Sequence, residues 1–236
     1  MKRLKNWDNK TWLSSKKYIL SFNHFLNNNI KIKKSSIILD IGCGRGNVIS
    51  FLQTKYNLNE KPIGVDIIKN DNIKKNIIFK KIDAIKYLKT TKKLFDLILI
   101  KQTIHFFSKK KIKILIKLAK LRLNKNGKIF ILSLNPKKNE IPCFGLMKLN
   151  LEKSLKKDFY LINYIKKELK KSTEKKYNFK VIILKKKYIN MIKKRYISCL
   201  LKLSKRQLIQ GIYELSKVYK NKIVFNDKLI CLIYKN

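Results

Sequence analysis

Short apolar runs recur along the first 134 residues of the chain and predict buried β-strands. Five runs have this character: 36–41, 62–68, 76–84, 94–100 and 128–134. Apolar residues at helical spacing mark the segments 7–29 and 109–123, and a shorter helical pattern follows the first strand. Strand and helix therefore alternate, which is the pattern of a parallel sheet covered by helices on both faces.

The second part of the chain departs from this alternation. Residues 151–171 have a helical pattern and residues 178–184 have the composition of a strand. Ser204 and Gln207 are spaced as a capping box at the start of a further helix. The last apolar stretch, KIVFNDKLICLIY, contains Asn-Asp at its centre, and this pair predicts the turn of a C-terminal hairpin.

A glycine-rich loop follows the first predicted strand in the stretch SIILDIGCGRG. Gly42, Gly44 and Gly46 stand at every second position around Cys43, so the backbone there is open to close approach by a ligand. The loop is one residue shorter than the dinucleotide fingerprint, and Asp40 precedes it by two positions. A carboxylate gains nothing from a pyrophosphate, but it attracts the two positive charges of S-adenosylmethionine (SAM). The loop therefore favours SAM over NAD.

Two further aspartates stand at the ends of the next two predicted strands. Asp66, followed by Ile67, is placed to accept hydrogen bonds from both ribose hydroxyls of a nucleoside. Asp83, followed by Ala84, is placed to accept one from an adenine amino group. Each aspartate alone is as well explained as a cap of a strand or helix. Together with the glycines they predict a nucleoside site at the carboxyl ends of the strands.

The ordered stretches ILDIGCGRG, IGVDI, IDA, FDLILIKQTIHFF and LNKNGKIFIL resemble the successive motifs of class I SAM-dependent methyltransferases, over roughly residues 36–134. The resemblance implies a doubly wound, mostly parallel seven-stranded sheet with the last strand antiparallel. It also implies a SAM-binding site formed by the glycine loop and the aspartates, together with Lys101. Both ends of the chain further resemble small-molecule methyltransferases of the trans-aconitate type.

This resemblance divides a single methyltransferase domain, residues 1–236, into three parts. Residues 1–35 hold a lid helix, from which Trp7, Trp12 and Tyr18 are expected to cover the cofactor. Residues 36–134 form the SAM-binding core, and 135–236 supply a substrate-side segment and the C-terminal strands.

The residues that would surround the methyl acceptor follow the fourth predicted strand and lie in the C-terminal part. His105 is a candidate general base or hydrogen-bond donor, with Gln102 beside it. Arg195 and Tyr196 are candidate ligands for a carboxylate or hydroxyl of the acceptor. We expect His105 and Arg195 to face each other across one pocket. The predicted function is methyl transfer to a small-molecule acceptor such as a carboxylate.

Two alternatives stay open: an RNA methyltransferase, which the positive charge of the chain would help, and a non-catalytic SAM-binding module. The chain has 58 Lys and Arg against 14 Asp and Glu, a net charge of +44. Only five of the basic residues are Arg, the side chain that nucleic-acid sites prefer, so RNA is not favoured. An A- and T-rich genome would explain the abundance of Lys, Ile and Asn, but it does not explain the scarcity of acids.

The remaining composition predicts a cytoplasmic protein without a metal site. Four cysteines are scattered outside metal-binding spacing and only two histidines are present, so neither a zinc site nor a disulfide framework is expected. No apolar run reaches the length of a membrane span, and the basic N-terminus is not followed by the apolar core of a signal peptide.

Overall fold

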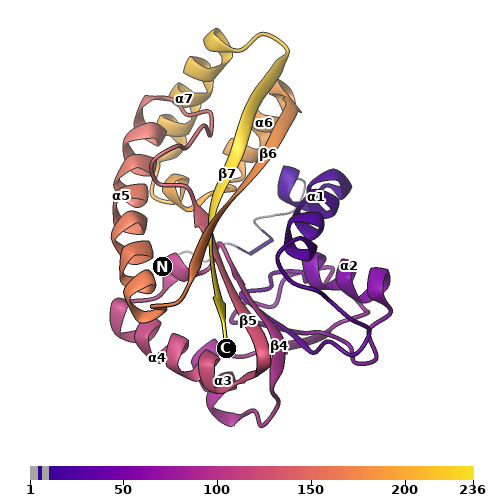
Figure 1. Ribbon diagram of the computed structural model, residues 1–236. Coiled ribbons are helices and arrows are strands. Elements are labelled where there is room, and N and C mark those ends of the chain that lie inside the picture. The colour runs from indigo at the N-terminus through magenta and orange to yellow at the C-terminus, as the bar shows by residue number, and fades with distance from the viewer. Residues whose placement is uncertain (1–4, 7–10) are drawn as a thin grey trace.

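The computed structural model, which describes residues 5–6 and 11–236, is built around one seven-stranded sheet (Figure 1). Its strands are β1 (Ile38–Ile41), β2 (Ile63–Asp66), β3 (Ile78–Lys81), β4 (Phe95–Lys101), β5 (Leu123–Leu134), β6 (Thr173–Leu184) and β7 (Lys222–Lys235). They lie in the order β3-β2-β1-β4-β5-β7-β6. Neighbouring strands from β3 to β5 are parallel, and β7 is antiparallel to both β5 and β6. The predicted fold class is confirmed.

Helices cover both faces of the sheet (Figure 1). The helices are α1 (Lys16–Asn27), α2 (Asn47–Tyr56), α3 (Ala84–Thr90), α4 (Lys109–Leu121), α5 (Gly145–Glu168), α6 (Lys185–Lys193) and α7 (Lys205–Val218). Three 3-10 turns accompany them: η1 (Trp12–Ser14), η2 (Ile104–Phe106) and η3 (Ser198–Leu200). Helices α1 and α2 lie on one side, and α3, α4 and α5 on the other. Helices α6 and α7 pack beside the far ends of β6 and β7.

Alternating side chains of the central strands supply two separate hydrophobic cores. In β5, Phe130 and Leu132 belong to the core under α1 and α2, whereas Ile129 and Ile131 belong to the core under α3, α4 and α5. Successive residues of a strand point to opposite faces, so an apolar residue at every position is required where both faces are covered. This explains why these strands appear in the sequence as continuous apolar runs.

Helix boundaries follow local capping signals. The Ser108 hydroxyl accepts from the backbone N–H of Lys111 and begins α4, as expected. Ser204 and Gln207 form the predicted capping box of α7. The N-terminal helix begins only at Lys16, because the Ser15 hydroxyl caps it through Tyr18 N–H. Trp7 lies outside the described residues.

Two sequence predictions are corrected by the structure. The third predicted strand, 76–84, is shorter in the structure, because β3 ends at Lys81 and the unpredicted helix α3 begins at Ala84. Asp83 caps this helix, and its carboxylate accepts from the N–H groups of Ile85 and Lys86 at 2.9 and 3.1 Å. Asn226 and Asp227 do not form a turn but lie inside the single long strand β7, opposite Lys180 and Phe179 of β6. Pairing with β6 keeps this segment extended and overrides the local turn preference.

Candidate functional site

A cavity of about 440 Å³ lies beyond the carboxyl ends of the parallel strands. Its wall is formed by the loops after β1 to β5, by η1 near the N-terminus, by α5, and by residues 196–201 between β6 and β7. Its volume is within the range of small-molecule sites, and its position is where open α/β sheets bind their ligands.

Gly42 and Gly44 in the loop after β1 require glycine for different reasons. Gly42 has φ +73°, and a Cβ there would lie 2.1 Å from Oγ1 of Thr103 in the loop after β4. Gly44 has φ +58°, and a Cβ there would meet no atom within 4 Å. Gly42 thus lets two loops approach each other, while Gly44 leaves open space beside the backbone, as the approach of a ligand requires.

Asp66 is held at the end of β2 with its carboxylate on the cavity wall. Its Oδ2 accepts from Gly44 N–H at 3.0 Å and its Oδ1 from Ile68 N–H at 2.9 Å. Burial nevertheless raises the pKa of this carboxyl above its usual value. A carboxylate has about four lone-pair sites, so Asp66 retains acceptor capacity for hydroxyl groups of a bound ligand.

Asp40 lies behind the glycine loop and is only 5% exposed. Burial raises the pKa of Asp40 to about 7, an effect that nearby Lys101 opposes and Asp66 reinforces. The Lys101 ammonium lies 5.0 Å from the ring centre of Tyr18 and 5.2 Å from that of Phe22. Asp40 is therefore a carboxyl whose ionisation near neutral pH depends on the charges around it.

The cavity is lined by eight of the predicted site residues: Gly42, Asp66, Ile67, Asp83, Ala84, Gln102, His105 and Tyr196. Six others are not on its wall: Asp40, Cys43, Gly44, Gly46, Lys101 and Arg195. Asp83 caps α3 and also lines the cavity, so the capping explanation holds and the side chain is placed where a ligand could contact it.

His105 is a half-buried, uncharged residue of the cavity wall. It lies in η2, with its ring centre 4.0 Å from that of Phe106. Burial, reinforced by the charge of Lys157, lowers the pKa of His105 to about 4. The imidazole is therefore neutral at physiological pH and suits hydrogen bonding better than proton abstraction.

Arg195 does not face His105. Its Nη1 donates to the Leu200 carbonyl at 2.5 Å, across the turn that precedes η3, and its side chain is not on the cavity wall. Tyr196, the next residue, does reach the cavity, and its hydroxyl is 3.0 Å from that of Tyr188. The expected pairing of His105 with Arg195 is not present, so Arg195 gives no support to a carboxylate acceptor.

Sequence reasoning missed two buried acids on the wall. Asp158 of α5 is 7% exposed and Asp227 of β7 is 1% exposed. Asp158 continues the apolar stripe of Leu151, Leu155 and Ile162 at helical spacing, and this placement of an acid was visible in the sequence. Asp227 was hidden because its Asn-Asp pair was interpreted as a turn.

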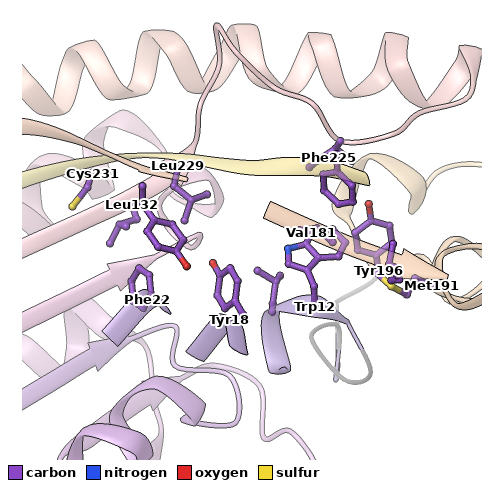
Figure 2. Close-up of a cluster of buried hydrophobic side chains, with 14 of the residues drawn as sticks. Trp12, Tyr18, Phe22, Leu132, Val181, Met191, Tyr196, Phe225, Leu229 and Cys231 are labelled. Atoms are coloured by element: carbon purple, nitrogen blue, oxygen red, sulfur yellow. The ribbon is translucent and has the colours of Figure 1, made fainter. Parts of the chain in front are cut away.

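The N-terminal segment closes one side of the site through Trp12. Its indole Nε1 donates to Asp227 Oδ2 at 2.9 Å. Its ring makes edge contacts with Tyr196 and Phe225, with centres 5.5 and 5.1 Å apart, and Figure 2 shows the three rings grouped together. Residues 12, 196 and 227 thus join three distant parts of the chain at the cavity wall.

A sheet in this strand order, with a glycine loop after β1 and a carboxylate at the end of β2, defines the class I SAM-dependent methyltransferase fold. Residues 38–127 match a family model described as a methyltransferase domain. No curated protein matches the sequence. The resemblance to methyltransferases of the trans-aconitate type is not shown by these comparisons.

Solved structures support the same fold. The plantazolicin methyltransferase BpumL, crystallised with S-adenosylhomocysteine (SAH) and a pentazolic desmethylPZN analog, is 18% identical with a TM-score of 0.54. The alignment covers 98% of this chain and 88% of that one. A SAM-dependent methyltransferase from Archaeoglobus fulgidus is 20% identical with a TM-score of 0.51, over 92% and 94% of the two chains. At such identities the likeness shows the fold alone.

Proposed function

We propose that this chain transfers a methyl group from SAM to a small molecule bound in the same cavity. The proposal rests on the observation that the predicted cofactor residues and the predicted acceptor residues line one and the same cavity. Asp66 and Asp83 lie on it near the glycine loop, and His105 and Tyr196 lie on it beyond the ends of β4 and β5. A cofactor and an acceptor would therefore share a single cavity.

The residues at the nucleoside end fit SAM. The Asp66 carboxylate would accept from the ribose hydroxyls, and Asp83, with Ile67 and Ala84, would surround the adenine. Asp40 would balance the positive charge of the cofactor from behind the loop, with Lys101 adjusting its ionisation. SAM supplies a methyl group already activated by its sulfonium, so the protein has to align the acceptor and exclude water.

The acceptor end is suited to that task. Leu151, Leu155 and Ile141 provide apolar surface, and Trp12 with Tyr196 covers it. Neutral His105 and Gln102 offer hydrogen bonds for orienting an acceptor. In BpumL an azole compound is bound together with SAH, and a comparable pairing of ligands is what we propose for this cavity.

We further propose that residues 1–236 act as one domain and that the protein works in the cytoplasm. The four cysteines are all free thiols, which suits a reducing compartment. None of the helices in the described part of the chain is long and apolar enough to cross a membrane.

Binding of SAM tests the proposal most directly. Calorimetric titration should detect SAM and not NAD. Asp66→Asn should weaken SAM binding by roughly 1–3 kcal/mol, because the ribose hydroxyls lose a charged acceptor. Glu60→Gln is the matched control, since Glu60 is a half-exposed carboxylate away from the cavity that pairs with Lys93. NAD binding without SAM binding, or equal affinities for the two variants, would refute the proposal.

A further inference from the structure

The cavity wall is rich in acidic residues although the molecule as a whole is basic. The chain carries 58 basic and 14 acidic residues. Four of the acids line this one cavity: Asp66, Asp83, Asp158 and Asp227. Among the described residues, Lys111 is the single Lys or Arg on the wall, and His105 is neutral. An anionic acceptor would therefore enter a negative cavity, whereas a cationic one is attracted to it.

Asp158 is the acid that the fold itself leaves without a hydrogen bond. Its side chain is on the cavity wall, more than nine-tenths buried, and no group in the described part of the chain donates to it. The charge that acts on it is that of Lys157, the preceding residue on α5. The Asp158 carboxylate is open to the cavity, so a ligand that displaces solvent there has to supply a donor in its place.

Asp227 provides a second buried carboxylate at the same cavity. Its Oδ2 is occupied by the Trp12 indole, but its Oδ1 has no partner among the described residues. One lysine acts on each carboxylate, Lys101 on Asp227 and Lys157 on Asp158, but only Asp227 also accepts a hydrogen bond from a described residue. Asp158 is thus the less compensated of the two and the better anchor for a positive ligand.

Resting on the methyltransferase function proposed above, we infer that the acceptor is an apolar molecule with a basic nitrogen, bound as an ammonium by Asp158. The ammonium supplies a hydrogen-bond donor and a positive charge directly at the carboxylate. Ser154 lies one helical turn before Asp158 on the same wall, and Leu151 and Leu155 contact the apolar part. Carboxylic acids are excluded by the same charge, which replaces the earlier expectation of a carboxylate acceptor.

Calorimetry on the full chain saturated with SAH tests this inference. The probes are phenylalkyl compounds with two to four methylene groups, each as amine, alcohol and carboxylic acid. In the unchanged protein, the best amine should bind at least about tenfold more tightly than its matched alcohol and acid. In Asp158→Asn the amine should lose about tenfold, while the alcohol stays within about twofold.

Glu152→Gln is the matched control, because Glu152 is an exposed acid on the same helix and is not on the cavity wall. It should retain the preference for amines. Asp158→Ser provides a second variant that removes the charge. An acid that binds as tightly as the amine, the absence of any amine binding, or an Asp158→Asn protein with unchanged amine affinity overturns the inference. If SAH itself fails to bind, the proposed function fails; if SAH binds without a preference for amines, only this inference fails.

Discussion

The ionisation of Asp40 should make the affinity of the site for SAM depend on pH. Its pKa is raised to about 7 mainly by burial, so in the free protein it is partly protonated near neutral pH. A positive ligand favours the ionised carboxylate and lowers its pKa. By linkage, affinity for SAM is then greatest above the pKa of the free protein and falls as the pH drops below it.

We therefore expect SAM affinity to fall by up to about tenfold per pH unit between pH 7 and 5.5. Asp40→Asn should bind SAM more weakly and with a shallower dependence on pH over this range, because one of the titrating groups is gone. Calorimetry at several pH values measures both effects. A flat profile for the unchanged protein would show that Asp40 does not respond to the charge of the ligand.

His105 illustrates why residue-level chemistry is hard to assign from sequence. Its position after β4 placed it correctly on the cavity wall. Its ordinary pKa suggested a general base, but burial in the folded chain lowers that pKa to about 4. The sequence shows where His105 lies relative to the fourth strand. It does not show which side chains of other elements surround the imidazole and set its pKa, such as Lys157 of α5.

Among the elements, the strands were predicted best because β1, β2 and β4 are buried on both faces and therefore continuously apolar. Helix α3 was missed because it is only seven residues long and adjoins β3 closely. The glycine loop and the aspartates after β2 and β3 belong to local motifs and were found. Asp158 and Asp227 reach the cavity only through the packing of α5 and β7, so no local motif marks them.

The contact between η1 and β7 should be important for stability. Trp12→Phe removes the indole donor and leaves the buried Asp227 carboxylate without its described hydrogen bond. We expect the free energy of unfolding to fall by roughly 1–3 kcal/mol, as measured by urea denaturation. In an Asp227→Asn background the same change should cost less, because the buried acceptor is no longer charged. A Trp12→Phe protein as stable as the original would contradict this role.

At the scale of the whole molecule, RNA binding to the basic surface and SAM binding in the acidic cavity should respond differently to salt. The surface charge attracts any polyanion, so the logarithm of the affinity for single-stranded RNA should fall linearly with the logarithm of salt concentration. SAM affinity should change less than about twofold between 0.05 and 0.5 M salt, because buried interactions are weakly screened. Filter binding and calorimetry measure the two quantities.

RNA binding that persists at high salt and competes with SAH would instead favour the RNA methyltransferase alternative. Weak RNA binding without such competition is the general behaviour of a strongly basic protein and supports the small-molecule proposal.

The segment between β6 and β7 leaves and rejoins the sheet at neighbouring positions. Leu184 and Lys222 are paired across the two strands, and Lys185 N–H donates to the Asn221 carbonyl at 2.9 Å. Helices α6 and α7 lie between these points, beside the extended ends of the strands (Figure 1). Because both attachments sit on one strand pair, the segment can be exchanged or lengthened without shifting the register of the sheet. Evolution, or a protein engineer, can therefore replace the part that contributes Tyr196 to the cavity while the cofactor half of the site stays the same.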